Sequence, residues 1–143
     1  MYAHPLGFNL FNLNNSKFNI NKIKKAIVVE GEKSCFKYQS YFGIENDITV
    51  ACCGSSLSSY QVNLLLENGA QEIIIAFDRQ FQEIGDKEFK MLKNKLLKIR
   101  QKYKNYATIS FIFDKNKYTN YKDSPLDKDK ETFLKLYKER IIL

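Results

Sequence analysis

Apolar residues in this chain occur in two patterns: short runs rich in β-branched residues, and longer stretches in which they recur every three or four positions. The short runs are bounded by turn residues, as is typical of strands that lie buried on both faces of a parallel sheet. We therefore expect four strands, at residues 26–29, 48–52, 72–77 and 108–113.

Segments with helical periodicity separate these strands. The longest one, about residues 86–106, carries a continuous apolar stripe formed by Phe89, Leu92, Leu96, Ile99, Tyr103 and Tyr106. Ser58 and Gln61 have the spacing of a capping box, and Asp127 is the expected N-cap of the last helix. The remaining helices are expected at about residues 33–42, 58–68 and 127–138.

This alternation predicts an α/β fold with a mostly parallel, four-stranded, Rossmann-like sheet and helices on both faces. Residues 26–143 are expected to form this domain, because a chain of 143 residues is long enough to bury one hydrophobic core. Residues 1–25 are rich in Asn with interleaved Phe, and we expect them to be an irregular lead-in or the remnant of a linker to an upstream domain.

The overall composition favours a cytoplasmic protein with a polyanionic partner. No apolar run approaches the roughly 20 residues of a membrane span, and no signal-peptide pattern opens the chain. The formal net charge of +7 favours binding to phosphate backbones, although frequent Lys and Asn are also typical of proteins from AT-rich genomes.

Cysteine and histidine give little support to thiolate or histidine chemistry. Cys35, Cys52 and Cys53 form no Cys-x-x-Cys pair, so a zinc site is not expected. Cys52 and Cys53 are expected to be small, half-buried packing residues. His4 is the only histidine and lies near the N-terminus, where we assign it no role.

Three of the four predicted strands end on an acidic residue: Glu30, Asp78 and Asp114. The carboxyl ends of parallel strands meet at one edge of the sheet, where ligands bind in open α/β folds. Two carboxylates about 5 Å apart repel by roughly 3 kcal/mol at an effective dielectric near 20, so such a cluster needs a cation or neighbouring bases. Magnesium prefers oxygen ligands of this type and acts on phosphates.

Basic residues near the strand ends offer an alternative. Lys33, Arg79 and Lys122 lie close in sequence to the acids, and we expect them either to pair with the carboxylates or to contact phosphate or nucleic acid. The lysines along the long helix are expected mainly to form its solvated face. Most aromatic residues have core-facing periodicity, which favours packing over base stacking.

The order of these motifs resembles the toprim domain, which topoisomerases, bacterial-type primases and some nucleases share. The resemblance covers about residues 24–140 and is carried by Glu30-Gly31 after the first strand, the small-residue turn beginning at Gly54, and Ala76-Phe77-Asp78 after the third. Gly31 and Gly54 are the expected turn residues. Residues 29–34, 121–125 and 127–133 are most similar to phage-type DNA primases.

The resemblance implies roles for individual residues and for the chain. Glu30 would act in acid–base chemistry or metal organisation, and Asp78 would bind Mg²⁺ or Mn²⁺. The chain would be the catalytic toprim domain of a DNA primase, performing metal-dependent nucleotidyl transfer in RNA primer synthesis and inactive in isolation. Its partners would be single-stranded DNA template, RNA primer, nucleoside triphosphates and, in addition, a helicase.

Two departures from the family pattern leave other functions open. Gln80 stands where the second aspartate of the Asp-x-Asp motif is expected, so it would be a weaker, uncharged ligand. Ser34 replaces another acid, and Asp123 is a further candidate ligand. The alternatives are a small toprim nuclease acting on RNA or DNA, and a degenerate, non-catalytic module that binds nucleic acid or a replication partner.

Overall fold

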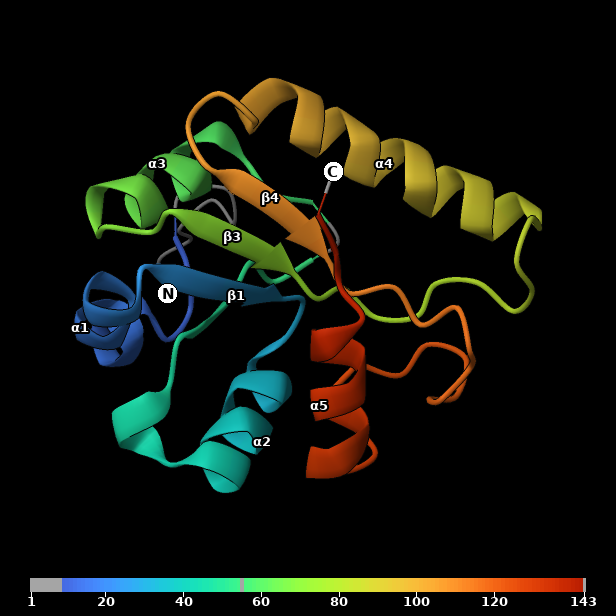
Figure 1. Cartoon of the computed structure of the whole chain (residues 1–143), viewed down its shortest axis with the longest axis horizontal. Coiled ribbons are helices and arrows are strands. Elements are labelled where there is room, and N and C mark those ends of the chain that lie inside the picture. The colour runs from blue at the N-terminus through green and yellow to red at the C-terminus, as the bar shows by residue number, and fades with distance from the viewer. Residues whose placement is uncertain (1–8, 55, 143) are drawn as a thin grey trace, which may run out of the picture.

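A five-stranded sheet with the order β2-β1-β3-β4-β5 forms the centre of the molecule (Figure 1). The computed structural model describes residues 9–54 and 56–142. The strands are β1 (Lys25–Val29), β2 (Thr49–Ala51), β3 (Glu72–Ile75), β4 (Thr108–Phe111) and β5 (Ile141–Ile142). The pairs β1–β2, β1–β3 and β3–β4 are parallel, and β5 is antiparallel to β4. The predicted α/β class is confirmed, and the sheet has one strand more than expected.

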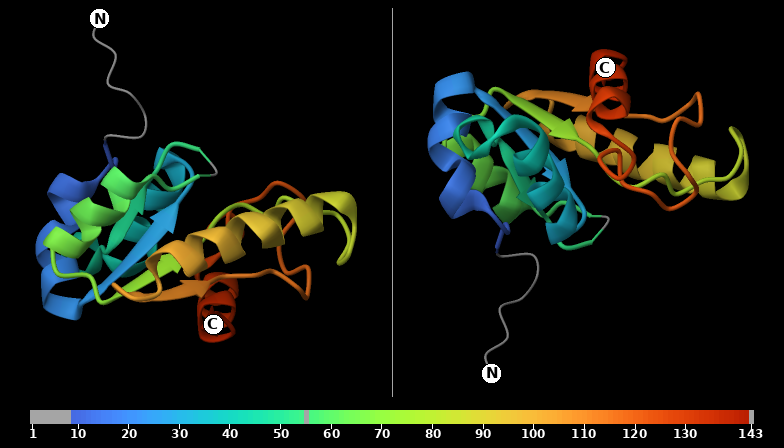
Figure 2. Two further views of the ribbon diagram at one scale, coloured as in Figure 1. Left: turned by 90° about the horizontal axis from the view of Figure 1, so that it is seen from above. Right: turned by 90° about the horizontal axis from the view of Figure 1, so that it is seen from below.

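The helices cover both faces of the sheet, as predicted. Right-handed crossovers place α3 and α4 on one face, whereas α2 and α5 lie together on the other (Figures 1 and 2). The ring of Phe133 on α5 packs edge-on against Tyr38 of α2, with centroids 5.8 Å apart. The bounds are α1 Leu13–Ile23, α2 Glu32–Phe42, a 3₁₀ turn η2 at Ile44–Asn46, α3 Ser59–Glu67, α4 Lys87–Tyr103 and α5 Lys130–Lys138.

The helix caps follow the sequence with one exception. Ser58 and Gln61 form the reciprocal capping box that their spacing predicts. The N-cap of α5 is Asp129, which accepts from the backbone N–H of Thr132, so the prediction of Asp127 in this position is wrong. Asp127 lies three residues before the first residue of α5 and binds elsewhere, as described below.

The segment expected to be an irregular lead-in contains a helix. Within the described part of residues 1–25, α1 covers Leu13–Ile23 and buries Ser16 and Ile20. Just before it, Phe11 forms an antiparallel bridge with Ala51, so this segment covers the outer edge of β2. The helix was missed because its Asn-rich sequence has weak helix propensity, and its position depends on tertiary contacts instead. His4 lies outside the described residues.

The core consists of the strands and the inner stripe of the helices. Ile27, Ile73, Ile74 and Ile109 are at most 1% exposed, because both faces of the sheet are covered. The predicted stripe on α4 is buried at Leu92, Leu96, Ile99 and Tyr103, whereas Tyr106 lies beyond the helix and is 70% exposed. Among residues 9–54 and 56–142, no helix is long and apolar enough to cross a membrane.

Candidate metal and phosphate site at the ends of β1 and β3

Glu30 and Asp78 meet at the carboxyl ends of two neighbouring strands. In the sheet, β2 lies on one side of β1 and β3 lies on the other. The direction in which the chain adds strands therefore reverses between β1 and β3. Glu30 follows β1 and Asp78 lies just after β3. The backbone N–H of Asp78 donates to Oε2 of Glu30 at 2.8 Å. The predicted convergence of these two residues is confirmed, at the place where open α/β sheets bind ligands.

Gln80 lies beside the same carboxylate. Its side-chain amide donates to Oε2 of Glu30 at 2.7 Å, so one oxygen of Glu30 accepts from both Gln80 and the Asp78 backbone. These two donors fix the orientation of the Glu30 side chain. An aspartate at position 80 would instead place a third negative charge beside Glu30 and Asp78.

The carboxylate of Asp78 lies in a strongly negative environment. No hydrogen-bond donor from residues 9–54 or 56–142 contacts it. Burial is the largest cause that raises its pKa, to about 7, and three nearby carboxylates raise it further: Glu30, Asp127 and Asp123. Lys33 opposes this effect. The site therefore carries an excess of negative charge, which a bound cation would neutralise.

The side chains at this site fit a Mg²⁺ ion that is bound by few protein ligands and keeps several water ligands. Within the described ranges, no group of three or more His, Cys, Asp or Glu side chains is close enough to form a complete metal cage. Magnesium commonly binds through only one or two carboxylates, together with water and substrate phosphates. Glu30 and Asp78 supply such a pair, and burial together with the neighbouring carboxylates raises the pKa of Asp78 to about 7, which a cation at this position would oppose.

An open cleft of about 410 Å³ lies directly beside these carboxylates. Its floor carries Glu30, Asp78 and Gln80, and its walls come from α4 and from the loop before α5. Tyr121 donates its hydroxyl to Glu88 at 2.5 Å, and the Lys122 ammonium lies 5.4 Å from the Tyr121 ring centre. The remaining lining residues are Met91, Leu92 and Lys95. The cleft is thus lined by three acids, two lysines and an aromatic ring.

The loop after β3 is joined to the loop before α5 by two backbone hydrogen bonds. Arg79 N–H donates to the carbonyl of Asp123 at 2.8 Å, and Lys122 N–H donates to the carbonyl of Arg79 at 2.7 Å. Oδ2 of Asp123 accepts from the backbone of Asn120 at 3.1 Å and closes its own turn. Asp123 therefore lies near Asp78, as its effect on the Asp78 pKa shows, and its role as a metal ligand stays a prediction.

The three predicted phosphate contacts differ in how they are held. Arg79 donates to the carbonyls of Thr119 at 2.6 Å and Gln82 at 2.7 Å, so its guanidinium group organises the loops. Lys33 forms an ion pair with Asp127 at 3.5 Å. Lys122 is exposed and lines the cleft. Phosphate contact remains a prediction, for which Lys122 has the best position.

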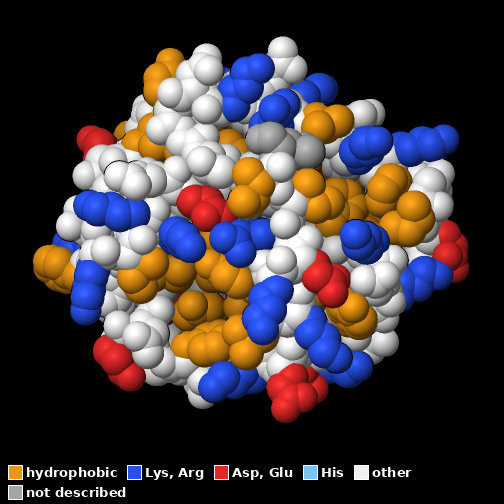
Figure 3. All heavy atoms as spheres, viewed as in Figure 1, with side chains coloured by type: hydrophobic (Ala, Val, Ile, Leu, Met, Phe, Trp, Pro, Cys, Tyr) orange, Lys and Arg blue, Asp and Glu red, His pale blue; other side chains and the backbone are white. Residues whose placement is uncertain are grey.

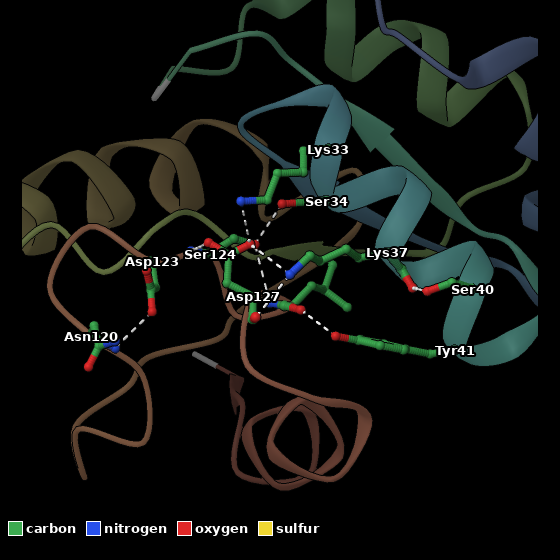
Figure 4. Close-up of polar contacts among 10 residues, drawn as sticks. Lys33, Ser34, Lys37, Ser40, Tyr41, Asn120, Asp123, Ser124 and Asp127 are labelled. Carbon is green, nitrogen blue, oxygen red and sulfur yellow. Dashed lines mark hydrogen bonds and ion pairs between the residues drawn. The ribbon is translucent and has the colours of Figure 1, made fainter.

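The start of α2 is docked onto the loop that contains Asp127 (Figure 4). Ser34 donates to the hydroxyl of Ser124 at 2.7 Å, and both residues are buried. Lys37 donates to the carbonyl of Asp127 at 2.9 Å, and Tyr41 donates to the carbonyl of Leu126 at 2.7 Å. Ser34, expected in place of an acid, thus has a packing role. Its position four residues after Glu30 was the only signal for it in the sequence.

Asp114 does not join the acidic cluster that the strand pattern suggested. Its side chain is 6% exposed and accepts from the backbone of Tyr118 at 2.7 Å and of Thr119 at 2.8 Å. The Thr119 hydroxyl also donates to it at 2.5 Å. The carboxylate is turned into its own loop by these donors, so the expectation of a third strand-end acid in the site is wrong.

The predicted turn residues and thiols have structural positions. Gly31 precedes α2, and Gly54 N–H donates to the Glu30 carbonyl at 3.2 Å. A Cβ at either glycine would meet nothing within 4 Å, so neither turn requires glycine for space. Burial raises the pKa of Cys35 and Cys52 to about 12, which keeps both as thiols, whereas Cys53 is exposed rather than half-buried.

Comparison with known proteins assigns the family. The family model of the Toprim domain matches residues 25–112. The chain belongs to the Toprim domain family. It is also 32% identical over 148 residues to the SPbeta prophage-derived uncharacterized protein YorJ of Bacillus subtilis (strain 168), covering 99% of this chain and 39% of that protein. The toprim resemblance inferred from the strand-end motifs is confirmed.

Solved primase structures share the fold of this toprim domain. The E. coli primase catalytic core has a TM-score of 0.70 at 20% identity, covering 100% of this chain and 42% of that one. The Aquifex aeolicus primase, with zinc-binding and RNA polymerase domains, has a TM-score of 0.66 at 22% identity, covering 98% and 32%. At these identities the similarity shows the fold alone. The chain spans less than half the length of each of these proteins.

Proposed function

We propose that this toprim domain holds Mg²⁺ or Mn²⁺ between Glu30 and Asp78 and contributes nucleotidyl transfer to RNA primer synthesis by a primase-type enzyme. The observation that carries this proposal is the contact between the Asp78 backbone and the Glu30 carboxylate, at the switch point of the sheet and beside an open cleft. The family assignment and the primase fold support it.

The residues of the site suit the transfer of a phosphoryl group. A divalent ion bound there would neutralise charge on phosphate oxygens and align the attacking oxygen. Glu30 lines the cleft, and the Asp78 backbone and the Gln80 side chain hold its carboxylate in position. Lys122, which lines the same cleft, would attract a phosphate, and Tyr121 beside it offers an aromatic surface.

Nucleic acid is the proposed partner. Structures of primase catalytic domains have been solved with single-stranded DNA and, for Mycobacterium tuberculosis, with double-stranded DNA. We extend this to a DNA template, an RNA primer and nucleoside triphosphates for the present chain, with a helicase as a further partner. Because the chain spans only 42% of the E. coli catalytic core, we expect these 143 residues alone to make no primers.

Metal titration and activity assays test this proposal together. We expect calorimetry at pH 8 to detect Mg²⁺ and Mn²⁺ binding to the wild type and to detect at least about tenfold weaker binding to Glu30→Gln, which loses a ligand charge. Glu67→Gln is the control, because Glu67 is an exposed acid at the opposite end of the sheet. No binding heat in the wild type would contradict the proposal. Metal-dependent cleavage of labelled RNA or DNA, lost in Glu30→Gln, would assign a nuclease instead.

The hydrogen bond from Gln80 to Glu30 favours a second candidate, a non-catalytic toprim module that binds nucleic acid or a replication partner. In this candidate the hydrogen bond from the amide, rather than a bound ion, stabilises the Glu30 carboxylate. A wild-type protein that binds nucleic acid equally well in EDTA and in Mg²⁺ would support this second function.

Gln80→Asp separates the two candidates. In the metal-binding protein it adds a ligand charge, and we expect Mg²⁺ affinity to rise about tenfold. Without metal, the new carboxylate repels Glu30 by up to roughly 3 kcal/mol before solvent screening, so we expect a lower melting temperature in EDTA that Mg²⁺ restores. Gln80→Ala is the matched control, because it removes the hydrogen bond without adding charge. Unchanged metal affinity in Gln80→Asp would count against a metal site here.

A further inference from the structure

A second concave surface lies on the other side of α4 from the metal cleft. We call it the apolar groove; it has a volume of about 330 Å³ between α4 and the β4–β5 edge of the sheet. Seven of its nine lining residues are apolar, two are lysines, and none is acidic. They are Ile84, Phe89, Lys93, Leu96, Leu97, Phe111, Phe113, Lys115 and Ile141. Figure 3 shows an apolar surface below α4, bordered by Lys and Arg side chains.

The groove is open because the helical layer ends before the sheet does. On this face α4 packs against β4, and β5 extends the sheet by one more strand. The helix that leads into β5, α5, lies on the opposite face (Figure 1). Within the described part of the chain, no helix covers β5 on the face of the sheet where α4 lies. Ile84 and Leu97 are consequently 50% and 37% exposed.

The groove is separate from the metal site. Phe81, Phe89 and Phe113 form a packed aromatic cluster, with Phe81 and Phe89 centroids 5.2 Å apart and Phe89 and Phe113 centroids 5.4 Å apart. Met91 and Lys95 of α4 face the cleft, whereas Lys93 and Leu97 of the same helix face the groove. A molecule in the groove would therefore contact α4 without blocking Glu30 or Asp78.

We propose that the apolar groove binds an amphipathic helix of a partner protein, with acidic residues flanking its apolar face. A helix lying 8–10 Å from α4 would complete the layer and fill the groove with side chains spaced at i, i+3 or i+4, and i+7. Lys93 and Lys115 are exposed, and neither ammonium group contacts a carboxylate among the described residues. Acidic side chains of the partner would pair with both.

Charge and polarity distinguish this occupant from others. An apolar floor gives phosphate groups no hydrogen-bond donors, so nucleic acid does not fit the groove itself. A second copy of this chain would bring another net charge of +7 to a basic rim, which opposes self-association. An acidic amphipathic helix would place apolar side chains against the apolar floor and carboxylates beside Lys93 and Lys115 at the rim.

A labelled peptide tests the proposal. The probe is a synthetic amphipathic helix of about 18 residues, with Leu on one face and Glu on the other, and binding is followed by fluorescence anisotropy. We expect saturable binding to the wild type and at least about tenfold weaker binding to Leu97→Asp and to Lys93→Glu with Lys115→Glu. Phe18→Asp is the matched control, because Phe18 is 76% exposed on α1, and we expect it to bind like the wild type.

Further controls keep the outcome specific. A peptide of the same composition with scrambled order carries the same charge without an apolar face, so we expect it to bind at least about fivefold more weakly. Circular dichroism melts will show that the variants are folded. Equal affinity for Leu97→Asp and wild type, or for the scrambled and amphipathic peptides, would overturn the proposal. A concentration-dependent dimer abolished by Leu97→Asp would assign the groove to a second copy and would also overturn it.

Discussion

Asp78→Asn is expected to raise the melting temperature of the metal-free protein at pH 8 and to abolish its binding of Mg²⁺ or Mn²⁺. Burial and the neighbouring carboxylates raise the pKa of Asp78 from 3.8 to about 7, so the folded state disfavours the charged form. The neutral amide has nearly the same shape and removes this cost. A residue kept at the expense of stability is typical of a binding site.

The pH dependence of this effect has a defined sign. The folded protein holds the Asp78 proton more tightly than the unfolded chain, so the contribution of Asp78 to stability falls as pH rises from about 4 to 7. We therefore expect Asp78→Asn to stabilise the protein most at pH 8 and little at pH 4. Mg²⁺ competes with the same proton, so it should raise the wild-type melting temperature more at pH 8 than at pH 6.

Thermal melts in EDTA and in Mg²⁺ measure both effects. Glu67→Gln controls for the loss of any surface carboxylate, since Glu67 is exposed at the far end of α3. A lower melting temperature of Asp78→Asn at pH 8 in EDTA would show that the Asp78 carboxylate stabilises the fold. The interpretation of Asp78 as a metal ligand whose charged form destabilises the metal-free fold would then be wrong.

The parts of this site that the sequence predicted are those that follow from chain topology. Short β-branched runs identify β1 and β3, and parallel pairing forces the residues after them to one edge, so Glu30 and Asp78 were predictable together. Asp114 also follows a parallel strand, but its carboxylate does not lie in the site, because backbone donors in its own loop bind it. Local hydrogen bonding of this kind leaves no periodic signal.

Elements that depend on tertiary contacts were not predictable. β5 has only two residues and becomes a strand through pairing with β4. The helix α1 has few apolar residues and is placed by Asn side chains, as in the bond from Asn19 to the carbonyl of Asp47 at 3.0 Å. The guanidinium group of Arg79 likewise donates to the carbonyls of Thr119 and Gln82. The bond to Thr119 joins two loops that are distant in sequence.

A buried carboxylate far from the metal site is expected to have the largest effect on stability. Asp47 is 0% exposed, and Oδ2 accepts from the side chains of Asn12 at 2.7 Å and Gln39 at 2.8 Å. Oδ1 accepts from the backbone and the hydroxyl of Thr49, at 2.9 and 2.6 Å. One side chain therefore joins the segment before α1, helix α2 and strand β2. No sequence pattern indicates this network, because a single Asp before a strand is typical of an ordinary turn.

We expect Asp47→Ala to lower the free energy of unfolding by about 3–5 kcal/mol, since it leaves several buried donors without an acceptor. Asp47→Asn should cost less, because one oxygen remains while the new amide opposes the donors on the other side. Urea denaturation at pH 7 measures both changes. Glu45→Ala, an exposed acid two residues away, is the control and should stay within about 0.5 kcal/mol of the wild type. If Asp47→Ala also stays within that range, the network does not hold α1 and α2 against β2, and the packing of the Asn-rich segment must depend on Phe11 and Ile20 instead.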